Sequence, residues 1–218
     1  MSLLKEIKEV GVVAVIRGAT EDNILKIASS LSAGGVKALE ITVETPKVLT
    51  LMEKVASEMG DEVIVGAGTV LDPETARAAI MAGSKFIFSP TVNTETIKMT
   101  KRYGAVSIPG AMTPTEILTA YEHGADMIKV FPANVVGAGY FKDVRGPLPH
   151  IPLMATGGIS IDNVAEYISA GAVAVGAGST LINTKVEFTE EHCRHVTETA
   201  ARFVSRVKQA RGGLLEKI

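Results

Sequence analysis

Short apolar runs alternate with helix-like segments along the chain, and a glycine stands at most of the junctions. Successive glycines of this kind lie 25, 23, 21, 20 and 47 residues apart, at Gly35, Gly60, Gly83, Gly104, Gly124 and Gly171. Glycine is favoured just past a helix because the backbone there turns left-handed. Strands are predicted in the runs that follow: KALEIT, EVIVGAG, KFIFSP, AVSIPG, DMIKVFP and AVAVGAG. Two further runs, VGVVAVI near residues 10–16 and IPLMAT near 151–156, complete a set of eight predicted strands.

Helices are predicted between the strands, and several begin at recognisable capping sequences. Asp72-Pro73, the TPTE sequence at 113–116 and the SIDN sequence at 160–163 carry the side-chain acceptors, prolines or acidic residues typical of a helix start. The first ten residues, MSLLKEIKEV, have the pattern of a short amphipathic helix. Because acidic residues lie within them, we interpret them as a helix and not as a signal peptide.

Eight strands that alternate with helices predict parallel pairing through right-handed crossovers. A closed barrel and an open doubly wound sheet both fit this order. The dinucleotide fingerprint of the open sheet is missing, since Gly66-Ala67-Gly68 lacks a third glycine. Near-equal units and a count of eight therefore favour an α/β fold in which residues 1–218 form a single (β/α)8 TIM barrel domain with a short N-terminal helix.

Alternation within the strands predicts which side chains face the interior of the barrel. Branched residues would face the helices, which leaves a mixed set of small and polar residues inside. That inward set is Ala38, Glu40 and Thr42; Met127, Lys129 and Phe131; and Ala172, Ala174 and Gly176. Glu40 and Lys129 then stand at the same height, on the second and sixth strands, and approach from opposite walls.

Composition and charge narrow the class of protein. The chain has 218 residues and 22.9 kDa, with 46% hydrophobic and 21% charged residues, so it can bury a large core. A net charge of -2 and a pI near 6.1 argue against nucleic-acid or anionic-membrane partners. A single cysteine excludes an internal disulfide framework, and no apolar stretch approaches a membrane span. We expect a cytoplasmic globular protein.

Lys129 is the strongest chemical anomaly, because its neighbours in DMIKVFP are apolar. Lysine is rarely buried, since stripping water from an ammonium is costly. A structural ion pair, or a side chain that reaches past the end of the strand to solvent, would explain a lysine at this position without a catalytic role. The functional interpretation is an amine that burial holds partly uncharged, able to attack a ketone and form a Schiff base.

Glu40 is the second anomaly, an acid in the middle of the apolar strand ALEIT. It could simply neutralise the buried Lys129. It could also act as a general acid and base whose pKa is raised by burial. Both interpretations require the two side chains to be close, and together they favour imine chemistry.

Glycines at the ends of the last two strands predict a phosphate site. Gly157 and Gly158 follow the seventh strand and lead to a helix expected near Ser160, and Gly178-Ser179 follows the eighth. In barrels these loops commonly bind phosphate through backbone N–H groups and a helix N-terminus. Arg17, at the end of the first strand, could supply charge to the phosphate or form a rim salt bridge.

No arrangement of metal ligands stands out, so we expect neither a metal nor another cofactor. His192, Cys193 and His195 lie in a polar helix at the C-terminal end, where this spacing is more typical of a solvated face. His123 and His150 are interpreted as a helix-end cation and a loop residue.

In order and spacing, eight segments resemble the class I aldolases that act on 2-keto-3-deoxy-6-phosphogluconate and 4-hydroxy-2-oxoglutarate. They are VVAVIR, ALEIT, VGAGTV, FIFSP, PGAMTPTE, IKVFPA, ATGGI and AVGAGS, across roughly residues 5–185. The resemblance implies a metal-independent (β/α) barrel lyase, assembled as a cytoplasmic homotrimer, that acts on a small phosphorylated keto acid in the Entner–Doudoroff pathway of carbohydrate metabolism.

The resemblance also implies roles for individual residues. Lys129 would be the Schiff-base lysine and Glu40 the proton shuttle. The substrate-binding residues would be Thr69, Pro90 and Phe131 around pyruvate, and Arg17, Gly157, Gly158, Gly178 and Ser179 around the phosphate.

One position departs from the family pattern. Many members carry an arginine four residues after the catalytic glutamate, where it helps to bind the substrate carboxylate, and this chain has Glu44. Another group, such as Thr69 with backbone amides, is then expected to bind that carboxylate.

Two other functions fit a phosphate-binding barrel. One is a phosphate-sugar isomerase, epimerase or synthase in which Lys129 acts only electrostatically. The other is a sensor or scaffold that binds a phosphorylated ligand without turnover.

Overall fold

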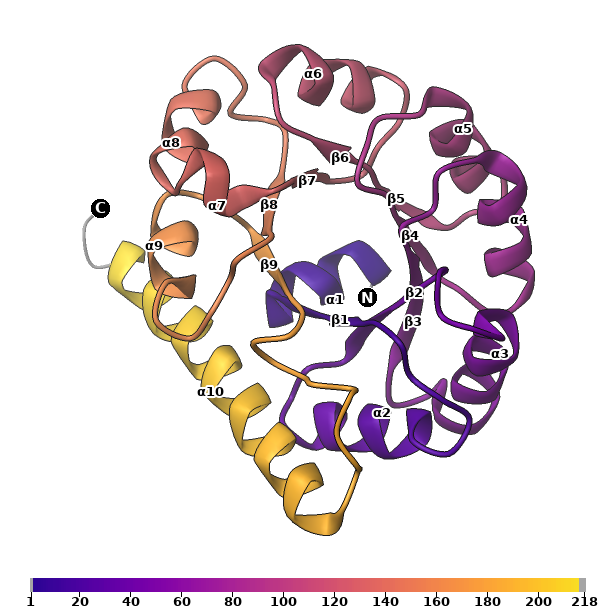
Figure 1. The fold of residues 1–218 in the computed structure, drawn as a ribbon. Coiled ribbons are helices and arrows are strands. Elements are labelled where there is room, and N and C mark those ends of the chain that lie inside the picture. The colour runs from indigo at the N-terminus through magenta and orange to yellow at the C-terminus, as the bar shows by residue number, and fades with distance from the viewer. Residues whose placement is uncertain (1, 216–218) are drawn as a thin grey trace.

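The computed structural model describes residues 2–215, and its strands form one parallel sheet (Figure 1). The strands are β1 (Val12–Ile16), β2 (Ala38–Thr42), β3 (Ile64–Gly68), β4 (Phe86–Phe88), β5 (Val106–Ile108), β6 (Gly110–Ala111), β7 (Ile128–Val130), β8 (Leu153–Thr156) and β9 (Ala174–Ala177). The helices are α1 (Leu3–Val10), α2 (Ile24–Ala33), α3 (Val48–Met59), α4 (Pro73–Met81), α5 (Thr94–Arg102), α6 (Pro114–Glu122), α7 (Ala133–Val136), α8 (Gly139–Arg145), α9 (Val164–Ser169) and α10 (Glu190–Leu215).

The sheet closes on itself because β5 and β6 share one position in the barrel wall. The strand order is β5-β4-β3-β2-β1-β9-β8-β7-β6, and only Pro109 separates β5 from β6. The first half of this wall segment pairs with β4 and the second half with β7. The nine strands therefore occupy eight wall positions, which confirms the predicted (β/α)8 TIM barrel.

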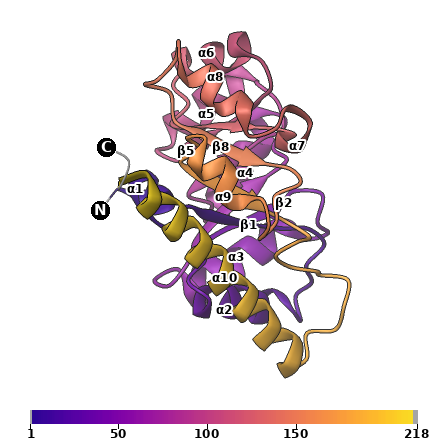
Figure 2. The same ribbon diagram turned by 90° about the vertical axis from the view of Figure 1, so that its left-hand side faces the viewer.

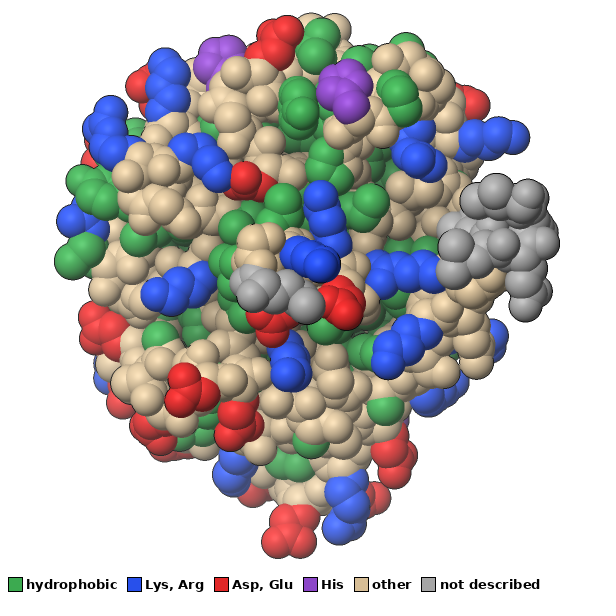
Figure 3. Space-filling model, turned by 180° about the vertical axis from the view of Figure 1, so that it is seen from behind, with side chains coloured by type: hydrophobic (Ala, Val, Ile, Leu, Met, Phe, Trp, Pro, Cys, Tyr) green, Lys and Arg blue, Asp and Glu red, His purple; other side chains and the backbone are tan. Residues whose placement is uncertain are grey.

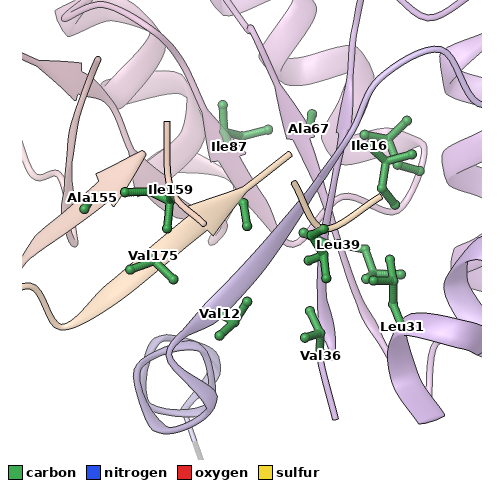
Figure 4. Close-up of a cluster of buried hydrophobic side chains, with 14 of the residues drawn as sticks. Val12, Ile16, Leu31, Val36, Leu39, Ala67, Ile87, Ala155, Ile159 and Val175 are labelled. Atoms are coloured by element: carbon green, nitrogen blue, oxygen red, sulfur yellow. The ribbon is translucent and has the colours of Figure 1, made fainter. Parts of the chain in front are cut away.

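The alternation of side chains produces two cores, one inside the barrel and one between strands and helices. The inner core contains Phe86, Phe88, Met127 and Met154 among others. The outer core is larger and includes branched residues such as Val12, Leu39 and Val175 (Figure 4). The expectation that branched residues face the helices does not hold in every strand, because Val13, Ile64, Val106 and Ile108 lie in the inner core.

The alternation predicted for β2 and β7 is confirmed, and the one predicted at the start of β9 is wrong. Ala38 and Met127 lie in the inner core, and Leu39, Ile41, Ile128 and Val130 lie in the outer core. Ala172, however, belongs to the outer core, and Val173 packs against the inner one. The reason is that β9 begins only at Ala174, so these two residues precede the pleated strand.

The predicted N-terminal helix closes one end of the barrel. Figure 1 shows α1 crossing the barrel opening, and Ile7 of α1 belongs to the inner core. Figure 2 shows α10 running obliquely along the outside, where it packs against α9 and α2. With one end covered by α1, the carboxyl ends of the strands form the accessible end of the barrel.

Most predicted helix boundaries follow from local chemistry. Thr113 and Glu116 form a complete capping box at α6, and Asp72 accepts from the N–H of Thr75 at α4. Five of the six spacing glycines have positive φ. Gly60 is the exception with φ −61°, so the expected left-handed turn is absent there.

Acidic and basic side chains are interspersed on the face that α1 covers (Figure 3). Within the described part of the chain, no helix combines the length and hydropathy of a membrane span.

Candidate active site

Lys129 lies in the barrel interior on β7, with only 6% of its surface exposed. Its Nζ is 5.3 Å from the ring centroid of Phe88 and 5.0 Å from that of Phe131. Aromatic faces attract a cation weakly and exclude water around it. The side chain is therefore held in apolar surroundings, as the sequence predicted, and does not extend into bulk solvent.

Glu40 lies in the interior on β2 and is 1% exposed. Its Oε2 has no hydrogen-bond partner within the described residues. The carboxylate fits because the neighbouring wall residue is Gly68, where any Cβ would collide with Oε1. Burial raises the pKa of Glu40 above its ordinary value of 4.5, although the charges of Lys129 and Arg17 oppose this shift and that of Glu44 adds to it. An unpartnered carboxyl of this kind suits proton transfer.

The two charged side chains face each other across the barrel. In a ring of eight wall positions, β2 and β7 are four apart, so Glu40 and Lys129 project from opposite walls as predicted. Among residues 2–215 they do not form an ion pair within 4.0 Å, although the charge of Lys129 acts on the pKa of Glu40. The interpretation of Lys129 as one half of a structural salt bridge is therefore weakened.

Thr69, Pro90 and Phe131 stand at the carboxyl ends of β3, β4 and β7, around the rim above Lys129. Thr69 has φ +59°, a conformation that is costly for a β-branched residue and is found mainly at functional sites. Pro90 and Phe131 also line a cavity of about 330 Å³ that extends toward Met112 and Glu116 of the following loop and helix.

Gly157 and Gly158 require glycine for reasons of backbone and packing. Their φ angles are +100° and +70°. A Cβ on Gly157 would lie 3.1 Å from Cα of Pro132, and one on Gly158 would lie 2.6 Å from Cβ of Asn134. Glycine at this pair is thus explained by its positive φ angles and by close packing on α7.

The expected helix N-terminus is not next to these glycines. The helix α9 begins at Val164, and the preceding turn uses the Asn163 side chain, which accepts from Ser160 N–H and donates to the Gly158 carbonyl. Within residues 2–215, the N–H groups of Gly158 and Ser179 donate to no protein acceptor. Any anion here would therefore meet loop amides and not a helix end.

Arg17 lies at the rim, where its Nη1 is 3.2 Å from Oε1 of Glu44. The structure therefore pairs Arg17 with the residue at which the chain departs from the family pattern. Burial opposes ionisation of Glu44, but its own backbone N–H, the charge of Arg17 and the Thr42 hydroxyl hold the pKa of the carboxyl below its ordinary value. The rim salt bridge that the sequence left open for Arg17 is present.

Hydroxyl groups surround this part of the site, and sequence reasoning assigned them no role. The Thr42 and Thr45 hydroxyls lie 3.4 Å apart, and Thr45 accepts from Gly18 N–H. The Thr156 hydroxyl is buried on β8 without a partner among the described residues. Only the inward register of Thr42 was predicted from the sequence, and the partners of these hydroxyls depend on neighbouring strands and loops.

No group of three or more His, Cys, Asp or Glu residues in the described ranges is arranged to hold a metal ion. The C-terminal histidines pack with aromatic neighbours instead: the ring centroid of His192 is 4.8 Å from that of Phe188 and 6.2 Å from that of His195.

Comparison with known proteins finds aldolases of one kind both by sequence and by structure. The profile of the KDPG and KHG aldolase family matches residues 3–198. The 2-dehydro-3-deoxy-6-phosphogalactonate aldolase of Escherichia coli is 33% identical, over 91% of this chain and 95% of its own length. The 2-dehydro-3-deoxy-phosphogluconate aldolase of Pseudomonas aeruginosa is 36% identical over 80% of each chain.

A solved structure with the same fold is that of KDPG aldolase from Legionella pneumophila, with pyruvate captured as a covalent carbinolamine intermediate. It is 27% identical, with a TM-score of 0.84 over 92% of this chain and 97% of its own.

Proposed function

The chain belongs to the KDPG and KHG aldolase family, and we propose that it is a class I aldolase that cleaves 2-keto-3-deoxy-6-phosphogluconate to pyruvate and glyceraldehyde 3-phosphate. The observation that carries this proposal is the buried Lys129 facing the unpartnered carboxyl of Glu40 across the barrel. 4-Hydroxy-2-oxoglutarate, cleaved to pyruvate and glyoxylate, is proposed as a second substrate.

The reaction begins with the amine of Lys129. Uncharged Nζ attacks the C2 ketone of the substrate, and loss of water from the carbinolamine gives an iminium ion. Glu40 assists this dehydration by supplying a proton to the departing hydroxyl. The rings of Phe88 and Phe131 lie against Lys129 and keep bulk water away from the amine and from the imine that it forms.

Glu40 then carries the proton that cleavage requires. As a carboxylate it takes the proton of the C4 hydroxyl, the C3–C4 bond breaks, and its electrons move toward the iminium nitrogen to give an enamine. The aldehyde leaves. Return of the proton to C3 and hydrolysis of the imine release pyruvate and regenerate the amine. A raised pKa suits Glu40 to accept and to return a proton, because its carboxylate is a stronger base than that of a solvated glutamate.

The remaining rim residues are proposed to orient the substrate. Thr69, Pro90 and Phe131 surround the pyruvate portion. Gly157, Gly158, Gly178 and Ser179, with Arg17, bind the phosphate, and the free N–H groups of Gly158 and Ser179 support this assignment.

The stereochemistry at C4 separates the two sugar-acid substrates of the relatives. Pyruvate release is to be measured with 2-keto-3-deoxy-6-phosphogluconate, its galactonate epimer and 4-hydroxy-2-oxoglutarate, with and without a chelator. The proposal expects the highest kcat/KM with the gluconate compound and no effect of the chelator. A preference for the galactonate epimer would reassign the substrate within the family, and chelator-sensitive cleavage would contradict the Schiff-base mechanism.

The pH dependence of turnover follows from the environment of Glu40. Because burial raises its pKa above 4.5, the carboxylate needed for cleavage is lost as the pH falls through a value higher than that of a solvated glutamate. We predict an acidic limb in kcat/KM, which reports ionisations of the free enzyme, with its midpoint above pH 4.5, measured by steady-state kinetics over a range of substrate concentrations. A midpoint at or below 4.5 would show that Glu40 is not the titrating group.

We also propose that the enzyme is a cytoplasmic homotrimer of the Entner–Doudoroff pathway, as its family membership suggests. Light scattering coupled to size-exclusion chromatography is expected to give a mass three times that of the 22.9 kDa chain.

A further inference from the structure

The backbone of Arg17 is hydrogen-bonded on both sides, while its side chain is largely exposed. The Thr184 hydroxyl donates to the Arg17 carbonyl, and Thr45 accepts from the next N–H, at Gly18. Thr184 lies in the segment after β9, and Thr45 follows β2. The side chain as a whole is nevertheless 63% exposed, which leaves room for the guanidinium to change partner while the backbone stays in place.

Two different partners flank this side chain. Strand β1 pairs with β2 on one side and with β9 on the other. Beyond β2 lies the Glu44 carboxylate, which now contacts the guanidinium at 3.2 Å. Beyond β9 lies Gly178, whose position is next to Val15 of β1. Arg17 thus stands between a resident carboxylate and the loop proposed to bind phosphate.

We propose that Glu44 is a specificity-determining residue that holds the Arg17 guanidinium over β2 until the phosphate of the substrate takes its place. This inference rests on the proposed function, because it assumes that a phosphorylated keto acid enters the site. It adds a role for the residue at which this chain departs from its family.

The pair has the properties that such an exchange requires. Exposed ion pairs of this kind stabilise weakly, so a better anion can displace the carboxylate. A phosphate dianion offers arginine two parallel hydrogen bonds and more charge than a carboxylate does. A substrate without phosphate keeps its C1 carboxylate but presents no dianion at the opposite end, and for it Arg17 stays with Glu44. Glu44 therefore raises the KM of the phosphorylated substrate slightly. It also makes binding depend more strongly on how well the anionic group of the substrate competes with a carboxylate for Arg17.

The test is a double-mutant cycle with a matched control. E44Q, R17Q and E44Q/R17Q are compared with the wild type, using the phosphorylated substrate and the same compound without its phosphate. E44Q is expected to lower KM for the phosphorylated substrate about three- to fivefold. The variants are compared at one pH above the acidic limb, because the charge of Glu44 also acts on the pKa of Glu40. The change should vanish in the R17Q background, and KM for the dephosphorylated compound should not fall.

E21Q serves as the control, because Glu21 forms a similar exposed ion pair with Lys47, at 2.8 Å, on the same rim. It removes the same unit of charge without freeing Arg17, so its KM should equal that of the wild type. Equal effects of E44Q and E21Q, or an E44Q effect that persists in R17Q, would overturn the inference. Pyruvate trapping by borohydride distinguishes failure of the proposed function from failure of the role given to Glu44. If the wild-type protein traps no pyruvate, the proposed function is refuted. If trapping is normal and E44Q leaves KM unchanged, only the role of Glu44 is refuted.

Discussion

Replacing Lys129 with arginine is expected to reduce kcat by at least about 10⁴-fold, to the limit of detection. A guanidinium keeps the positive charge and much of the volume but cannot add to a ketone and lose water. Any electrostatic role of Lys129 would survive this change, whereas covalent catalysis would not. Turnover is measured by coupled detection of pyruvate.

The control for K129R is K85R, the same substitution at an exposed lysine just before β4, near the end of the barrel that α1 covers. It should leave kcat within error of the wild type. Circular dichroism and thermal unfolding of K129R show whether the barrel still forms. Folded K129R with kcat within tenfold of the wild type would show that cleavage does not require a Schiff base at residue 129 and that Lys129 acts only through its charge.

Replacing Glu40 with glutamine is expected to reduce kcat by about 10²–10⁴-fold, the usual contribution of a general acid and base. Because Lys129 is retained, the variant should still form some covalent adduct with pyruvate. It should also lose the acidic limb of the pH profile. Loss of trapping together with turnover would instead mean that Glu40 is needed to form the imine at all.

The same substitution, which lowers kcat, is expected to raise the stability of the folded protein relative to the wild type. The pKa of Glu40 in the folded protein is raised by burial, so the folded state binds more protons than the unfolded state between pH 4.5 and that raised value. The contribution of Glu40 to the free energy of unfolding therefore falls as the pH rises through that range. Glutamine does not titrate, so E40Q lacks this dependence on pH.

Thermal unfolding from pH 5 to pH 8 measures this effect. The melting temperature of E40Q relative to the wild type should increase as the pH rises. A difference that is constant with pH would show that Glu40 does not titrate differently in the folded and unfolded states.

Much of the fold could be predicted from the sequence because its signals are local. The capping box at Thr113 and Glu116 and the left-handed glycines depend on a few neighbouring residues. The division of one wall position into β5 and β6 could not be predicted in this way. Pro109 has no N–H to give to the sheet, and whether it breaks a strand depends on which neighbours pair on each side.

The site likewise contains residues that could be predicted from local sequence and residues whose arrangement depends on distant neighbours. Glu40 and Lys129 could be identified because strand alternation forces an inward register on polar residues among apolar ones. The Arg17–Glu44 pair could not, since two exposed side chains at the ends of neighbouring strands have many possible partners. The left-handed Thr69 also lacks a sequence signal, because the surrounding structure imposes that conformation against the preference of the residue.

The central claim is that the Lys129 amine captures a keto acid covalently inside the barrel. Incubation of the wild-type protein with pyruvate and sodium borohydride, followed by digestion and mass spectrometry, tests it most directly. The predicted result is a single reduced pyruvate adduct on the Nζ of Lys129, absent in K129R. Full recovery of unmodified Lys129, or an adduct on a different lysine, would contradict it.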